Sequence, residues 1–162
     1  WRRLRIDADE QIRLQSIETA VAPLTWVVRK MAGGVLRSTT APRAEIHFVW
    51  DGRKLVERVP GHQGIETRLV DPGAGTLKSI DSRGEPFEGD WRWTAEGLRF
   101  RWRQDQAYGE NLYRLDDDRH ELTIDHAIHV TAIEGIQPIL YRSHFARVDL
   151  PAVSSPGPDA AR

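Results

Sequence analysis

Aromatic side chains recur at every second position of two neighbouring segments in the middle of the chain. They are Trp91, Trp93, Phe100 and Trp102. Alternate residues of a β-strand point to opposite faces, so two strands here would share one aromatic face. Indole and phenyl rings offer a large contact area at a small cost in rotamer entropy. If this face points inward, the four residues are predicted to form the walls of a pocket for a hydrophobic ligand.

The arginines that alternate with these rings allow a different interpretation. Inward-facing arginines would bind a carboxylate or a phosphate, because unpaired buried guanidinium groups are too costly without an anion. We expect the aromatic residues inside and the arginines, such as Arg92 and Arg101, in solvent. A small barrel can also fill its interior with its own side chains, in which case it has no pocket.

A histidine interrupts the apolar face of a long alternating segment, 121–131. This residue, His126, is a candidate polar anchor for a ligand head group or a candidate general base, since an unperturbed imidazole has a pKa of about 6.5. A core histidine that hydrogen-bonds to a neighbour is the alternative. An enzyme would need His126 or His144 to meet a carboxylate, such as Asp125 or Glu110, inside one cavity.

The last expected strand carries Tyr141 and Arg142, two further candidates for contacts with a ligand head group. Metal binding is not expected, because His126 and His129 are three residues apart and so point to opposite faces of a strand. The sequence contains no Gly-x-Ser-x-Gly, His-Glu-x-x-His or phosphate-loop motif. Its motifs therefore predict no cofactor.

The composition is typical of a soluble globular protein. The chain has 162 residues, enough to bury a core without disulfides, and we expect one domain over 1–150. Its net charge of −1 predicts no nucleic-acid partner. No stretch approaches the roughly 18 apolar residues of a membrane span, so we expect no stable membrane insertion. The chain begins at Trp1, which indicates either a removed export signal and a periplasmic location or a shortened chain.

Two helices are expected near the beginning of the chain. Asp7 and Glu10 have the spacing of a capping box, and Pro23 predicts that the first helix ends near Val21. Pro23 can also open a second helix. The apolar face of that helix is expected to cover the rest of the protein, and it consists of Leu24, Val28, Met31 and Val35.

From residue 44 the hydrophobic period is two, with turn residues between the segments. With an opening strand in 1–6 we expect ten strands; the other nine are 44–50, 54–59, 65–70, 76–80, 89–94, 98–103, 111–115, 121–131 and 139–149. Short turns predict an antiparallel meander, and closure into a barrel removes its exposed edges. The fold is therefore predicted to be mostly β: an up-and-down barrel of about 8–10 strands with a helix-turn-helix after the first. The tail 151–162 is rich in Pro, Ser and Ala and is expected to be disordered.

This order of elements resembles the calycins, the superfamily of lipocalin-like barrels, and looks most like their fatty-acid-binding branch. The resemblance covers residues 1–149, and the opening Trp1-x-x-Leu4 is loosely similar to the start of lipocalin barrels. The Arg-x-Tyr of the last strand in that branch is replaced here by Tyr141-Arg142. The pattern is also similar to that of exported bacterial proteins. The resemblance implies a helical lid over the barrel mouth.

These observations predict a protein that binds a small hydrophobic or amphipathic molecule in a barrel cavity. Two other hypotheses stay open. One is an isomerase, cyclase or hydrolase that uses a histidine and a carboxylate in the same barrel. The other is a structural domain whose interior is filled by its own side chains.

Overall fold

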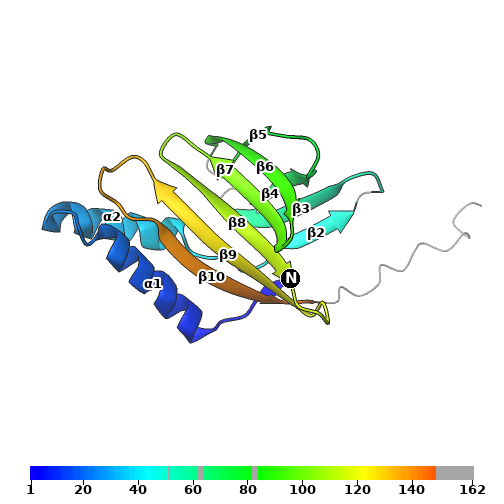
Figure 1. Cartoon of the computed structure of the whole chain (residues 1–162), viewed down its shortest axis with the longest axis horizontal. Coiled ribbons are helices and arrows are strands. Elements are labelled where there is room, and N and C mark those ends of the chain that lie inside the picture. The colour runs from blue at the N-terminus through cyan, green and yellow to red at the C-terminus, as the bar shows by residue number, and fades with distance from the viewer. Residues whose placement is uncertain (51, 62–63, 82–83, 149–162) are drawn as a thin grey trace, which may run out of the picture.

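The described part of the protein consists of ten strands and two helices, and its strand pairings are antiparallel (Figure 1). The structure is a computed structural model that describes residues 1–50, 52–61, 64–81 and 84–148. The first elements are β1 (Arg2–Arg3), α1 (Asp7–Val21) and α2 (Trp26–Thr39). The meander consists of β2 (His47–Trp50), β3 (Leu55–Gly61), β4 (Gly64–Val70), β5 (Leu77–Ile80), β6 (Pro86–Thr94), β7 (Gly97–Arg103), β8 (Ala107–Leu115), β9 (Glu121–Val130) and β10 (Ile139–Ala146). This order confirms the predicted fold class, a mostly β protein with a helix pair after the first strand.

Hydrogen bonds divide the meander into two sheets. One has seven strands in the order β1-β10-β9-β8-β7-β6-β5, and the other has three in the order β2-β3-β4. A bridge between Arg2 and Glu45 connects them at one side. At the other side β4 and β5 do not pair within the described residues, so the barrel is not strictly closed. Side chains that include Arg68 and Phe87 line a gap of about 230 Å³ at this opening.

Two of the predicted boundaries concern the ends of the chain. The predicted disordered tail, 151–162, lies outside the described residues. The single domain predicted over 1–150 stays a prediction.

Trp1 lies beside the second sheet, because its amino group donates to the carbonyl oxygen of Ile46 at 2.8 Å. This contact adds to the bridge that joins β1 to the segment before β2.

The aromatic face of β6 and β7 points into the interior, as predicted. Trp91 pairs with Phe100 across the two strands, and their stacked ring centroids lie 4.5 Å apart. Trp91 is 1% exposed, whereas Arg92 and Arg101 on the opposite face are exposed. Trp93 corrects the expectation, since it is 70% exposed. It lies beside the turn into β7, opposite Leu98, which is itself buried.

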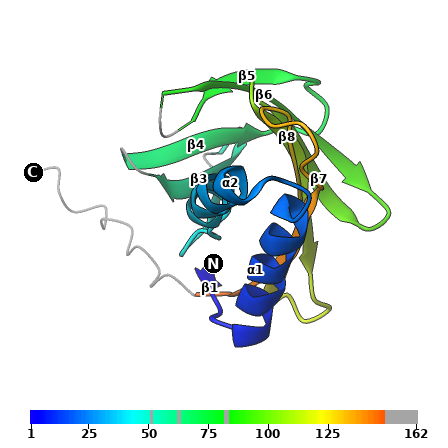
Figure 2. The same cartoon turned by 90° about the vertical axis from the view of Figure 1, so that its left-hand side faces the viewer.

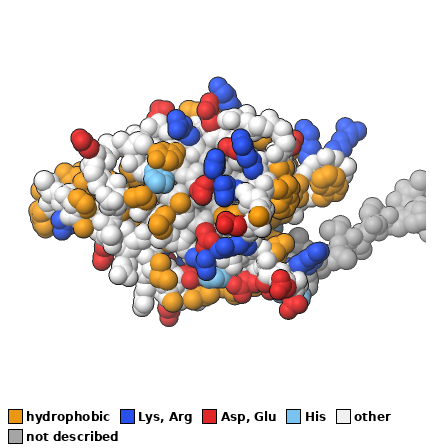
Figure 3. All heavy atoms as spheres, in the orientation of Figure 1, with side chains coloured by type: hydrophobic (Ala, Val, Ile, Leu, Met, Phe, Trp, Pro, Cys, Tyr) orange, Lys and Arg blue, Asp and Glu red, His pale blue; other side chains and the backbone are white. Residues whose placement is uncertain are grey.

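The outer face of the large sheet carries charged side chains in compensating pairs. Arg101 Nε lies 3.4 Å from Glu110, and Arg142 Nε lies 2.5 Å from Asp125, which also pairs with Arg114. Figure 3 shows basic and acidic side chains gathered over the middle of this face. Opposite charges on neighbouring strands satisfy each other, so the outward arginines are part of a solvated surface.

Helix α1 lies against β10 and ends where it was predicted to end. Its buried residues Ile17 and Val21 pack against Ile139 and Tyr141. The predicted capping box is wrong, because Ile6 is the N-cap and no side chain caps the helix. Glu10 instead binds arginine: its carboxylate accepts from Arg13 at 2.5 Å and from Arg3 at 3.3 Å. These strong charge-assisted bonds replace the expected cap.

Helix α2 begins three residues after Pro23 and continues through both glycines at its centre. Its predicted covering face is wrong for three of four residues: Val28, Met31 and Val35 are exposed, at 39%, 69% and 62%, whereas Leu24 packs against the helix core. The buried residues are Ala32, Gly33 and Leu36. No helix in the described ranges is long and apolar enough to cross a membrane.

The rotation of α2 is set by an arginine on α1. The buried Arg13 donates to the carbonyl oxygen of Arg37 at 3.1 Å and to Thr40 Oγ1 at 2.9 Å. These bonds fix the C-terminal turn of α2 against α1 and leave the Met31 side in solvent. Figure 2 shows both helices at one end of the two sheets. The hydrogen bonds of Arg13 also position the segment that follows α2, which is part of the site described next.

Candidate functional site

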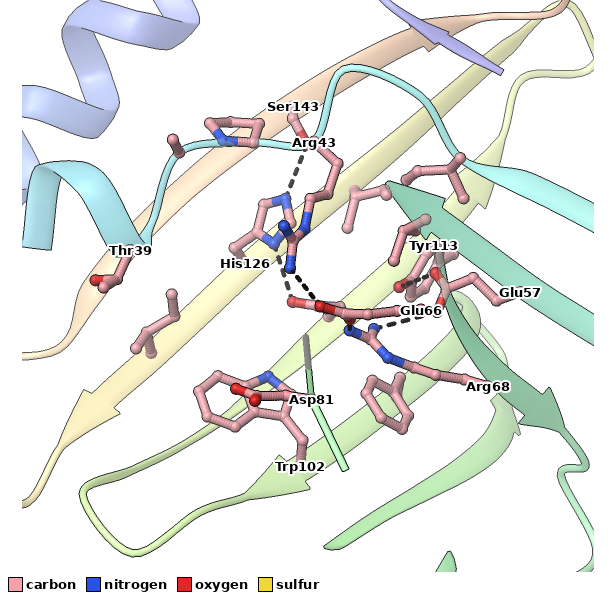
Figure 4. Close-up of a pocket in the computed structure, with 18 of the residues that line it drawn as sticks. Thr39, Arg43, Glu57, Glu66, Arg68, Asp81, Trp102, Tyr113, His126 and Ser143 are labelled. Carbon is pink, nitrogen blue, oxygen red and sulfur yellow. Dashed lines mark hydrogen bonds and ion pairs between the residues drawn. The ribbon is translucent and has the colours of Figure 1, made fainter. Parts of the chain in front are cut away.

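A cavity of about 210 Å³ lies inside the two sheets, beside the connection between α2 and β2. One part of its wall is apolar and includes Ile46, Phe87, Phe100, Trp102, Ile124 and Phe145. The other part is polar and is shown in Figure 4. Trp91, Leu98 and their neighbours fill the rest of the interior as a packed core. The interior is therefore partly filled and partly open.

His126 is held in the polar wall by two hydrogen bonds. Its Nδ1 lies 2.9 Å from the side-chain amide oxygen of Asn111, and its Nε2 lies 2.8 Å from the Ser143 hydroxyl (Figure 4). Burial lowers the pKa of His126 to about 3. The neutral ring therefore donates from Nδ1 and accepts from Ser143 at Nε2. The imidazole ring also stacks on the ring of Tyr141, and the two ring centroids lie 4.4 Å apart.

A second polar group consists of two arginines and two glutamates from the small sheet and the segment before it. Glu66 accepts from Arg43 Nη2 at 3.1 Å and from Arg68 Nη2 at 2.7 Å. Glu57 accepts from Arg68 Nη1 at 3.2 Å and from the Tyr113 hydroxyl at 2.9 Å. Glu57 is on β3 and Tyr113 is on β8, so their bond connects the two sheets through the interior. Figure 4 shows the four charged side chains converging.

Arg68 keeps its charge although it is largely buried. Burial opposes the charge, but Glu57 and Glu66 outweigh it and raise the pKa of Arg68 above its ordinary value. Its guanidinium carbon lies 5.6 Å from the ring centroids of both Phe87 and Phe100. Its Nε is buried and has no hydrogen-bond partner among the described residues. Arg68 therefore retains one N–H donor that its protein partners do not satisfy.

Tyr113 is protonated in this network. Burial, and next the charge of Glu57, raise the pKa of Tyr113 well above its ordinary value. The phenol therefore donates its proton to Glu57. The pKa of Tyr141 is also raised, chiefly by burial. Both tyrosines contribute neutral hydroxyl groups to the cavity at physiological pH.

Two glycines make room for the aromatic wall. A Cβ at Gly89 would lie 2.5 Å from the ring of Phe100. A Cβ at Gly109 would lie 2.8 Å from the ring of Trp102 and would overlap the carbonyl oxygen of Ala127. Gly89 and Gly109 are the strand partners of Trp102 on its two sides. A strand position without a side chain therefore allows each ring to lie close to the sheet.

We expect Gly109→Ala to lower the free energy of unfolding by about 1–3 kcal/mol, because the new methyl group overpacks Trp102 and a backbone oxygen. Urea unfolding measures this loss. Gly34→Ala is the matched control, since nothing lies within 4 Å of a Cβ at that helical position. The control is expected to raise stability by about 0.5–1 kcal/mol. Equal stability of Gly109→Ala and the wild type would contradict the packing described here.

The predicted site residues are distributed over three environments. Those that line the cavity are Phe100, Trp102, His126 and Tyr141. Trp91 is buried behind Phe100, in the packed core. Trp93 and Arg142 lie outside the cavity. Arg142 follows Tyr141 on β10, so it points outward and pairs with Asp125 instead of a ligand head group.

The charged residues of the cavity were not predicted from the sequence. Glu57, Glu66 and Arg68 alternate with Val59 and Val70 on the faces of β3 and β4 that point inward. A polar residue on an otherwise apolar face is the signal that identified His126, and it was available for Glu57 too. Arg43 lies in the connection after α2 and had no such signal.

The enzyme hypothesis requires a histidine and a carboxylate inside one cavity. The cavity contains His126 and the carboxylates of Glu57 and Glu66, but the hydrogen-bond partners of His126 in the described residues are an amide and a hydroxyl. Two other histidines do lie beside a carboxylate: His144 Nδ1 is 2.6 Å from Asp9 Oδ2, and His47 Nε2 is 3.4 Å from Glu45 Oε2. Neither of these pairs lines the cavity. The described residues contain no group of three or more that could hold a metal ion.

The described fold, a helix pair after the first strand of an antiparallel meander, is similar to that of a fatty-acid-binding protein. The chain is similar to a fatty acid binding protein of Schistosoma mansoni solved with arachidonic acid, with a TM-score of 0.50 and 12% identity over 85% of this chain and 89% of that one. A fatty-acid-binding protein of Manduca sexta matches with a TM-score of 0.42 and 12% identity over 63% and 71%. No family model and no curated protein matches. The likeness to exported bacterial proteins is not supported by these comparisons.

Proposed function

We propose that the protein binds one small amphipathic molecule inside the cavity. The observation that carries this proposal is an interior space of about 210 Å³ with aromatic rings on one side and hydrogen-bonding groups on the other. Such a combination is typical of small-molecule sites. The fold, which it shares with a protein that holds arachidonic acid, supports the same conclusion.

The volume of the cavity limits the size of the ligand. A dry cavity of about 150 Å³ accommodates benzene, so this cavity, which is open to solvent at one side, fits roughly eight non-hydrogen atoms and leaves the end of a slightly longer chain at the opening. Trp102 and Phe100 would contact the apolar part of the ligand, whereas His126 and Tyr141 lie on the polar side. We therefore expect compounds with a medium-length alkyl chain to bind better than long-chain lipids.

Tryptophan fluorescence tests this proposal. Titration with 1-octanol is expected to change the emission of the wild type, because Trp102 lines the cavity. The response is expected to disappear in Trp102→Phe and to persist in Trp93→Phe, whose replaced ring is on the surface. Isothermal titration calorimetry would confirm that Trp102→Phe still binds. Absence of binding by a panel of medium-chain alcohols, amides and acids would contradict the proposed function.

A further inference from the structure

The two arginines of the cavity already hold carboxylates that belong to the protein. Glu66 lies between them and offers one oxygen to each: Oε1 to Arg43 at 3.1 Å and Oε2 to Arg68 at 2.7 Å. Glu57 takes the second Nη of Arg68 at 3.2 Å. Both glutamates are buried. The place beside the guanidinium groups that a ligand carboxylate would take is thus occupied by Glu66.

The charges of this group also compensate one another. Arg43 and Arg68 supply two positive charges, and Glu57 and Glu66 supply two negative charges. An ionised ligand would therefore lose its hydration without meeting a net positive charge from these four described residues, and it would lie near the carboxylates of Glu57 and Glu66. His126 gives it no compensation, because the ring is neutral.

An uncharged oxygen fits the remaining donors of the cavity. Arg68 Nε is buried and has no hydrogen-bond partner in the described part of the chain. Arg43 is only partly buried and uses one nitrogen for Glu66. A hydroxyl or amide oxygen can accept from the nitrogens of Arg43 that Glu66 does not use, without bringing a charge into the cavity, whereas Arg68 Nε is enclosed by protein atoms. The aromatic wall at Phe100 and Trp102 would still contact the alkyl chain.

We propose that the cavity selects amphipathic ligands with an uncharged, oxygen-bearing head group over carboxylates, and that Glu66 determines this specificity. Glu66 acts as an internal substitute for the ligand carboxylate, because it holds both arginines. The inference rests on the proposed function, since it names the class of molecule that the same cavity binds. It predicts that free fatty acids are poor ligands.

Calorimetric titration of the wild type at about pH 7.5 with 1-octanol, octanamide and octanoate tests this inference, because octanoate is then ionised. The alcohol and the amide are expected to bind at least about tenfold more tightly than octanoate, owing to the cost of burying an uncompensated charge. Octanoate binding as tightly as the alcohol would overturn the inference and leave the proposed function standing. Failure of all three to bind would overturn both.

Variants test the role of Glu66. Glu66→Gln removes the internal carboxylate and is expected to tighten octanoate binding about tenfold while 1-octanol binding changes little. Glu66→Asp keeps the charge and is expected to keep the preference for the alcohol. Glu110→Gln, the same substitution on the outer face of β8, is the control and is expected to change neither affinity. An unchanged preference in a folded Glu66→Gln protein would overturn the assignment to Glu66.

Discussion

Glu57→Gln is expected to lower the free energy of unfolding by about 3 kcal/mol, although the two side chains have nearly the same size. Glu57 is 1% exposed and uses both carboxylate oxygens, one for Arg68 and one for Tyr113. The substitution removes a charge that a buried guanidinium needs. It also weakens a bond between β3 and β8, in two sheets that are hydrogen-bonded to each other only at one side of the described structure.

Urea unfolding of the variant and the wild type measures this effect. Glu110→Gln is again the matched control, because Glu110 forms an exposed ion pair with Arg101. Exposed pairs contribute little, so a loss of at most about 1 kcal/mol is expected for the control. If both substitutions lower the free energy of unfolding equally, the bonds of Glu57 to Arg68 and Tyr113 do not stabilise the interior.

Burial of His126 is expected to make the free energy of unfolding depend on pH. The pKa of this residue is about 3 in the folded protein against 6.5 for a free imidazole, because burial disfavours its charged form. Below pH 6.5 the unfolded chain therefore takes up a proton that the folded protein does not. The contribution of neutral His126 to the free energy of unfolding is therefore fully present above pH 6.5, and it is lost as the pH decreases toward 3. The total loss from this residue is about 4–5 kcal/mol, at about 1.36 kcal/mol per unit.

The difference in pH dependence between His126→Gln and the wild type isolates this contribution, since the other titrating groups are common to both. The variant is expected to be less stable than the wild type at pH 7, and to lose less stability between pH 6.5 and 4. His129→Gln is the control, because His129 lies on the opposite face of the same strand and stacks on Tyr108. Parallel stability curves for His126→Gln and the wild type would show that His126 is not buried in its neutral form.

Local sequence patterns predicted much of the fold. The alternation in β6, β7 and β9 placed Trp91, Phe100 and His126 on inward faces, and Pro23 predicted the end of α1. These predictions succeed because the strand period and the restriction before proline depend on residues that are close in sequence. The helix pair after the first strand was predictable for the same reason.

The rest depends on contacts between distant residues. Trp93 follows the alternation but is exposed, although its strand partner Leu98 is buried, so the alternation alone does not predict its environment. The rotation of α2 is set by Arg13, on the other helix. The pairing of Arg43 with Glu66 and of Arg68 with Glu57 requires β3, β4 and the segment after α2 to meet. No spacing within one segment specifies such a meeting.

A crystal structure of the protein with 1-octanol is the most direct test of the central claim, that the interior cavity binds an uncharged amphipathic molecule. We expect the alkyl chain beside Phe100 and Trp102, the hydroxyl within hydrogen-bond distance of Arg43 or Arg68, and the bonds from both arginines to Glu66 intact. Octanol bound only at the surface, with the cavity occupied by the protein's own side chains, would contradict the claim.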